Sequence, residues 1–107
     1  MWIFLSDAFL SVVADKDDPS GPRLLVRSRR EGDIERVFPE ADVTTTPAAD
    51  YRFRAWLPRE RVAAVLMQQV ETLAYANFKN TIHDRDYHDA ALDVWNVMYT
   101  YQGQQAA

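Results

Sequence analysis

The sequence predicts an α+β fold, in which a small antiparallel sheet of about four strands from the N-terminal half is packed on one face by two longer C-terminal helices plus one short helix. Two observations carry this prediction. Short β-rich runs alternate with turns before residue 58, and apolar residues recur at helical spacing after it. A chain of 107 residues also fits one domain, so we expect a single α+β domain over residues 1–107, with residues 103–107 as a frayed tail.

Four β-rich runs are expected to form the strands. They are Trp2 to Leu5, Phe9 to Ala14, Arg23 to Arg29 and Tyr51 to Leu57. The last run alternates strictly, which predicts one face with Tyr51, Phe53, Ala55 and Leu57 and an opposite face with Arg52, Arg54 and Trp56. The polar residues 15–22 predict a hairpin loop, and residues 40–50 predict a loop or a weak edge strand.

A short helix is expected between the third and fourth runs, over roughly residues 30–38, where Ile34, Val37 and Phe38 would form a buried stripe. Pro39 would end it. A second helix is expected from Pro58, at its first position, to about Leu73. Its apolar stripe consists of Val62, Val65, Leu66, Val70 and Leu73.

The third helix is expected from roughly Asp84 to Tyr101, and Gly103 would end it. One of its faces is apolar and is predicted to lie in the core. This face consists of Tyr87, Ala91, Val94, Trp95, Met98 and Tyr101. Tyr99 lies off this stripe, so Tyr99 and Trp56 are the aromatic residues most expected at the surface.

Composition narrows the classes of protein to which the chain can belong. It has no cysteine, which excludes disulfides, thiolate catalysis and cysteine-ligated zinc, and favours the cytoplasm. The first residues lack a basic segment, and Asp7 follows only four apolar residues, so no signal peptide is expected. No apolar run approaches the roughly 18–20 residues of a membrane span.

The net charge of −4 is unevenly distributed along the chain. Residues 23–61 contain nine Arg and seven acidic residues, whereas residues 1–22 contain four acids and one Lys. Residues 62–107 contain five acids, one Lys and one Arg. An arginine-rich middle between acidic flanks is compatible with a solvated surface or with a functional patch.

The arginine-rich middle yields the first candidate surface. Arg52, Arg54 and Trp56 share one strand face, and Arg27 and Arg29 share a face of their own strand. If the two strands are neighbours in register, four guanidinium groups line one side of the sheet. Arginine interleaved with aromatic rings can hold single-stranded nucleic acid or form the centre of a protein interface. The remaining alternative is an exposed face covered with long charged side chains.

The segment from His83 to Asp89 is the densest polar cluster. Metal binding is one interpretation, but His83 and His88 are five residues apart and would not share a helical face. General acid–base chemistry is another. The favoured interpretation is structural, because Thr81 or Asp84 can cap the helix and Asp84, Asp86 and Asp89 then lie where the helix dipole favours negative charge. We assign no catalytic residue, metal ligand or cofactor.

Five segments resemble a group of small bacterial and phage-borne proteins of unassigned function. They are residues 1–11, 24–27, 32–35, 50–55 and 94–99, which read MWIFLSDAFLS, LLVR, GDIE, DYRFRA and VWNVMY. The resemblance spans most of the chain and brings no catalytic residues. In size and charge the chain is also similar to phage inhibitors of host defence, including anti-CRISPR proteins.

The sequence therefore predicts a non-enzymatic protein that binds another macromolecule, as a small intracellular inhibitor or adaptor acting by protein–protein contact. The contact surface would be either the arginine face or the acidic helix start. The alternative is a nucleic-acid-binding module that uses the arginine face, and the third is a metal-dependent hydrolase that uses His83, Asp84 and His88. We expect no membrane partner, and the oligomeric state stays open.

Overall fold

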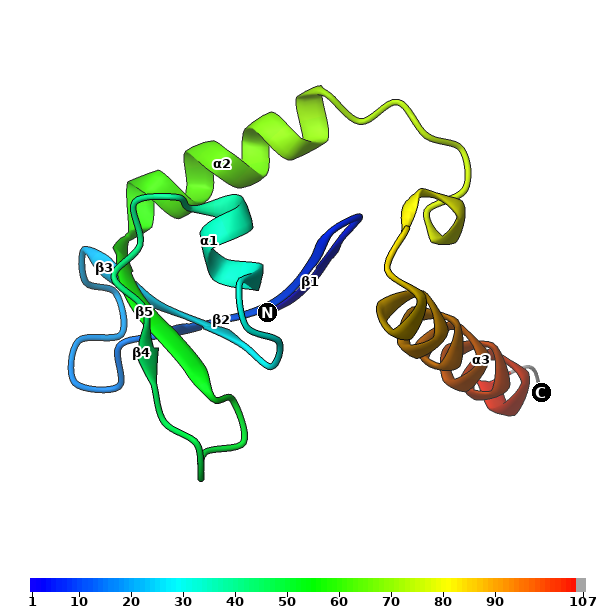
Figure 1. The fold of residues 1–107 in the computed structure, drawn as a ribbon, viewed down its shortest axis with the longest axis horizontal. Helices are drawn as coiled ribbons and strands as arrows, with labels where there is room; N and C mark the ends of the chain where they lie inside the picture. Colours follow the sequence, from blue (N-terminus) through cyan, green and yellow to red (C-terminus); the bar gives the residue numbers. More distant parts are fainter. Residues whose placement is uncertain (106–107) are drawn as a thin grey trace. The chain divides into compact units, whose positions relative to one another are not determined.

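The computed structural model describes residues 1–105 and confirms the α+β fold (Figure 1). Two compact units divide the chain, Met1–Ala74 and Tyr75–Ala107, and each is described by itself. The first unit contains a five-stranded antiparallel sheet in the order β1-β2-β3-β5-β4. Its strands are β1 (Trp2–Leu5), β2 (Ala8–Ala14), β3 (Arg23–Ser28), β4 (Thr44–Thr45) and β5 (Phe53–Pro58).

Neighbouring strands in the chain form the first part of the sheet. A two-residue turn joins β1 to β2, since Leu5 pairs with Ala8, and the polar loop after Ala14 joins β2 to β3. The one strand of the first unit that was not among the four predicted runs is β4, at the edge of the sheet. It lies within residues 40–50, for which the sequence predicted a loop or a weak edge strand. Its two threonines pair with Phe53 and Arg54 of β5.

One face of the sheet is covered by α1 (Asp33–Val37) and by the start of α2 (Arg59–Glu71). The predicted stripe of α1 is confirmed, because Ile34, Val37 and Phe38 are all buried. The sheet contributes alternate residues to the same core, namely Ala8, Leu10, Val12, Val26, Ala55 and Leu57. The core therefore consists of alternate residues of the strands packed against residues at helical spacing in α1 and α2.

Only the first half of the predicted α2 stripe enters this core. Val62 and Val65 are buried and Leu66 packs beside them. Val70 and Leu73, in contrast, are 72% and 52% exposed, so the predicted apolar stripe is not buried along its whole length. Figure 1 shows why, since α2 starts at the end of β5 and continues away from the sheet.

The second unit contains a short 3-10 turn, η1 (Lys79–Thr81), and the long helix α3 (Arg85–Gln105). Asp84 caps α3, because its Oδ2 accepts a hydrogen bond from the backbone N–H of Tyr87 at 2.9 Å. The predicted end at Gly103 is wrong: the helix continues to Gln105, and residues 106 and 107 of the expected frayed tail lie outside the described residues. A glycine costs a helix only about 1 kcal/mol, which does not stop it.

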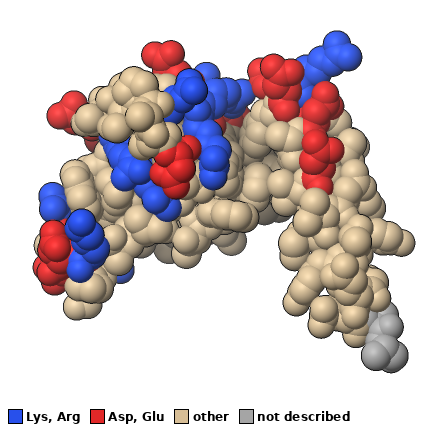
Figure 2. Space-filling view, turned by 90° about the horizontal axis from the view of Figure 1, so that it is seen from below, with Lys and Arg blue, Asp and Glu red and all other residues tan. Residues whose placement is uncertain are grey.

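The predicted core face of α3 is mostly solvent-exposed. Tyr87 and Ala91 are buried, but the four later members are between 40% and 55% exposed, namely Val94, Trp95, Met98 and Tyr101. The end of α3 beside the grey C-terminal atoms also carries no charged residue (Figure 2). Helical periodicity therefore identified an apolar face correctly but not its burial.

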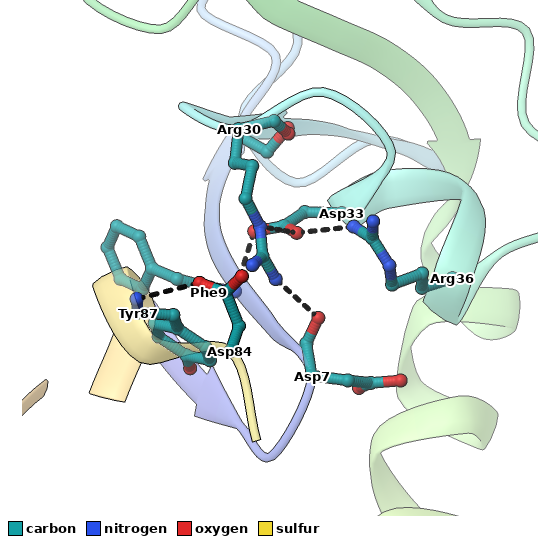
Figure 3. A network of polar contacts seen from close by, with 8 residues as sticks. Asp7, Phe9, Arg30, Asp33, Arg36, Asp84 and Tyr87 are labelled. Atoms are coloured by element: carbon teal, nitrogen blue, oxygen red, sulfur yellow. Dashed lines mark hydrogen bonds and ion pairs between the residues drawn. The ribbon is translucent and has the colours of Figure 1, made fainter. Parts of the chain in front are cut away.

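A buried carboxylate anchors α1. Asp33 is 3% exposed, and its Oδ1 accepts hydrogen bonds from Arg30 Nε at 2.8 Å and Arg36 Nη1 at 2.7 Å (Figure 3). Its Oδ2 accepts one from the backbone N–H of Phe9 at 3.1 Å, which ties the helix to β2. Gly32, immediately before α1, has φ +92°, a conformation that a side chain would strain.

Among residues 1–105, no helix is both long enough and apolar enough to cross a membrane.

Candidate partner-binding surface

The second face of the sheet, which we call the outer face, lies opposite the core face that α1 and α2 cover. Strand alternation assigns its residues as Trp2, Phe4, Phe9, Ser11, Val13, Arg23, Leu25, Arg27, Arg54 and Trp56. The strand register places seven of them, together with Thr44, in two rows across the sheet. One row crosses all five strands as Trp2, Ser11, Arg27, Arg54 and Thr44, and the next contains Val13, Leu25 and Trp56.

The arginine face was predicted on the condition that its two strands are neighbours in register, and the sheet meets this condition. Strands β3 and β5 are direct neighbours, and Arg27 lies opposite Arg54. Arg29 and Arg52 differ from the expectation, because β3 ends at Ser28 and β5 begins at Phe53. They flank the sheet at its end instead of standing on it.

Tyr51 is the centre of this end of the outer face. The guanidinium carbons of Arg27 and Arg29 each lie 4.3 Å from the centre of its ring. The prediction that Tyr51 lies on the same strand face as Phe53 is therefore wrong: Tyr51 precedes β5, where strand alternation no longer applies. Its ring is nevertheless buried, with 4% exposure, by contacts of arginine and aromatic residues.

The hydroxyl of Tyr51 has an altered acidity. Burial alone would raise its pKa, but hydrogen bonds with Arg29 and Ser11, the positive charge of Arg29 and a hydrogen bond with Trp2 together lower the pKa of the phenol below its ordinary value. Arg27 is fixed in the same cluster, since its Nη2 donates a hydrogen bond to Ser11 Oγ at 2.8 Å. Its Nε is buried without a hydrogen-bond partner.

Trp56 forms the second aromatic centre. It is 44% exposed, and the guanidinium carbon of Arg23 lies 3.7 Å from its ring centre. Arg23 is held in turn by Asp15, whose Oδ2 lies 2.9 Å from Arg23 Nε. The backbone N–H of Asp17 and the side chain of Arg23 lower the pKa of the Asp15 carboxyl, so this contact is an ion pair near neutral pH.

Two surface hollows flank Trp56 and share Leu25, Arg54 and Trp56 in their walls. One, of about 400 Å³, is bordered also by Asp42 and Thr44. The other, of about 340 Å³, reaches the hairpin loop at residues 14–17. Arg54 between them is fixed by Tyr51 O at 3.2 Å and Asp50 Oδ1 at 3.2 Å. The arrangement offers an exposed indole with a depression on either side.

The arginines of this surface differ in how their charge is balanced. Arg23 and Arg54 each pair with a carboxylate. Within the part of the chain that the structure describes, Arg27, Arg29 and Arg52 form no ion pair. The end of the outer face around Tyr51 is therefore its electropositive end.

The acidic helix start lies in the second unit. Asp84 is used in capping α3, as described above, and Asp86 and Asp89 lie on its first turns. Asp93 shares their side of the helix, because residues 86, 89 and 93 have i, i+3, i+7 spacing. The Nδ1 atom of His88 lies 3.4 Å from Asp89 Oδ1. No group of three or more His, Asp or Glu side chains in residues 1–105 is placed to hold a metal ion.

Sequence reasoning missed Trp2, Ser11 and Tyr51 as members of the arginine surface. Trp2 and Ser11 oppose each other across β1 and β2, and this relationship depends on a two-residue turn at Ser6 and Asp7. A two-residue turn at this place could have been predicted from the sequence. Once the turn length is known, period-two alternation places Trp2, Ser11 and Arg27 on one face of the sheet.

Comparisons of the chain with protein-family models, with curated proteins and with solved structures find no match. The resemblance to small phage-borne proteins stays a prediction.

Proposed function

We propose that this protein acts by binding another protein through the outer face of its sheet, as an inhibitor or adaptor without catalysis of its own. The observation that carries the proposal is the exposed Trp56, which is stacked by Arg23, lies beside Arg54 and is flanked by two hollows. Tryptophan and arginine dominate the binding energy of protein interfaces when they lie beside pockets that a partner can fill.

The fixed side chains of this surface support the same proposal. Arg23, Arg27 and Arg54 are each held by a hydrogen bond or an ion pair within the first unit. A partner therefore meets guanidinium groups that are already oriented, which lowers the entropy cost of binding. Arg27, Arg29 and Arg52 form no ion pair with any residue of the described range 1–105, and their charges favour a partner with acidic groups opposite Tyr51. Inhibition of a host defence protein is the specific form of this proposal that the resemblance suggests.

The test compares two tryptophans of similar exposure. Trp56→Ala removes the proposed anchor, whereas Trp95→Ala changes a half-exposed indole on α3, outside the sheet. Proteins that co-purify with the wild-type chain are identified by mass spectrometry and measured again with each variant. We expect Trp56→Ala to weaken capture of the partner at least tenfold, and Trp95→Ala to leave it within about threefold. Equal capture by all three chains would refute the proposal.

Nucleic-acid binding is the second candidate. Arg27, Arg29 and Arg52 carry no carboxylate partner in residues 1–105, and the first two lie against the ring of Tyr51. A labelled single-stranded oligothymidylate distinguishes the two. Binding that falls steeply between low and physiological salt, and that Arg52→Gln weakens, would favour nucleic acid. Absence of binding at low salt would remove this candidate.

The acidic side of α3 is the other surface named by the sequence. Neutralising Asp86, Asp89 and Asp93 together tests it in the same capture experiment. We expect capture to be unchanged, since the outer face carries the proposed anchor. Loss of the partner from this variant alone would transfer the interface to α3.

A further inference from the structure

The second unit has an exposed apolar surface that its own elements do not cover. We define the α3 apolar face as Val94, Trp95, Val97, Met98 and Tyr101, which are between 40% and 66% exposed. They project from a little over two turns on one side of the helix, within about 80° of its centre line. Tyr99 stacks on Trp95 at its margin, with ring centres 5.3 Å apart. Soluble proteins rarely expose such a patch unless it is an interface.

We propose that the α3 apolar face binds the same face of a second copy of this chain, with the two α3 helices antiparallel. The proposal is independent of the partner on the outer face. A two-fold axis beside Val97 and Met98 would place Val94 of one copy near Tyr101 of the other. This is the isologous arrangement found in most small homodimers.

The charge distribution along α3 favours a second copy in this orientation. Residues 94–105 contain no charged side chain, whereas Asp86, Asp89 and Asp93 all precede them. Figure 2 shows the same division, with acidic residues at one end of α3 and none beside the grey C-terminal atoms. A parallel pair would bring the two acidic starts together. The antiparallel pair with this axis places Asp93 level with the uncharged Gln102 of the other copy and keeps the two acidic starts at opposite ends of the contact.

The available area is sufficient for a dimer. An aromatic side chain presents about 200 Å² when fully exposed, and roughly half of Trp95 and Tyr101 is accessible. With the three aliphatic residues the face offers roughly 500 Å² per copy, or about 1,000 Å² for the pair, which reaches the lower limit of specific interfaces. We therefore expect reversible association at micromolar concentration.

The test compares two aspartates introduced on opposite sides of α3 in the full-length chain. Met98→Asp places a charge in the centre of the face, and Asn96→Asp adds the same charge about 160° around the helix. Both sites are exposed, so both variants should retain the helix content of the wild type by circular dichroism. By sedimentation equilibrium we expect a wild-type dimer, a Kd at least a hundredfold weaker for Met98→Asp, and a Kd within about threefold of the wild type for Asn96→Asp.

Disulfide trapping tests the orientation, because the chain has no cysteine of its own. Antiparallel helices with the stated axis place residue 90 of one copy near residue 105 of the other. We expect a mixture of Ala90→Cys and Gln105→Cys chains to form the mixed disulfide, and Ala90→Cys alone to stay reduced. A wild-type monomer at all concentrations would overturn the proposal, as would equal weakening by both aspartates. An Ala90→Cys homodimer would overturn the antiparallel arrangement.

Discussion

Arg27 and Tyr51 are stacked, with the guanidinium carbon of Arg27 4.3 Å from the centre of the phenol ring. This contact joins β3 to the segment that precedes β5. The guanidinium carbon of Arg29 lies at the same distance from this ring, so two positive charges contact one aromatic ring at this end of the outer face.

Replacing Tyr51 should destabilise the first unit. Tyr51→Ala removes a buried ring and both cation–π contacts, so we expect the free energy of unfolding to fall by about 3 kcal/mol. Tyr51→Phe keeps the ring and should cost about 1 kcal/mol. Tyr99→Ala is the control, because Tyr99 is 63% exposed. Urea denaturation measures all three, and equal effects at residues 51 and 99 would contradict the stacking argument.

The pH dependence of stability should carry the signature of Tyr51. Its pKa is lower in the folded protein than in the unfolded chain, so the folded protein releases the phenol proton first. The resulting stabilisation should grow as pH rises through the folded-state pKa, and be complete above the unfolded value of about 10. It should be absent below the folded-state pKa. The difference in unfolding free energy between wild type and Tyr51→Phe, measured against pH, checks this.

Arg29→Gln is the matched variant for the titration. It removes the positive charge and the strongest of the hydrogen bonds that lower the pKa of Tyr51. Ultraviolet titration should show one of the five tyrosines ionising first in the wild type and later in Arg29→Gln. An unchanged titration curve would show that Arg29 does not set this pKa.

Asp33 should be the most sensitive carboxylate of the first unit. Asp33→Ala leaves the backbone N–H of Phe9 and two arginines without their common acceptor. Because the two arginines can reach water, we expect the free energy of unfolding to fall by about 3 kcal/mol, which is the lower end of the range for breaking a buried ion pair. Chemical denaturation measures this fall. Glu35→Ala, on the exposed side of the same helix, should cost less than about 0.5 kcal/mol. Similar losses for both would contradict the anchoring role.

Asp84 should stabilise the start of α3. Asp84→Ala removes the acceptor for the backbone N–H of Tyr87, and an N-cap contributes about 1 kcal/mol. Asp86→Ala keeps the cap and loses only the interaction with the helix dipole, about 0.3–0.5 kcal/mol. Amide hydrogen exchange in the first turn of α3 would report the difference. Faster exchange in Asp86→Ala than in Asp84→Ala would contradict the capping assignment.

Local sequence signals predicted the elements of the fold well, because their determinants are local. Alternation gave the outer-face positions of Arg54 and Trp56, and helical spacing gave the buried stripe of α1. For the segment that contains the two-residue strand β4, the sequence predicted either a loop or a weak edge strand, because two threonines are too few to show a periodicity. The exposure of Val70 was missed for a different reason: periodicity identifies an apolar face but not the element that covers it.

The candidate surface was predictable only in part. Arg27, Arg54 and Trp56 follow from strand pairing, whereas the position of Tyr51 depends on where β5 begins. Asp33 was missed although Arg30 and Arg36 are each only three residues away, because its burial depends on the contact with the backbone of Phe9, and no spacing rule connects Phe9 to α1.

The backbone at Gly32 has a consequence for mutational libraries of this protein. A residue with φ +92° accepts a β-carbon only under strain, and this position directs the chain from β3 into the helix that carries Asp33. In a library randomised at the residues joining β3 to α1 and sorted for folded chains, we expect position 32 to return almost solely glycine. Its exposed neighbour Glu31 should accept many replacements.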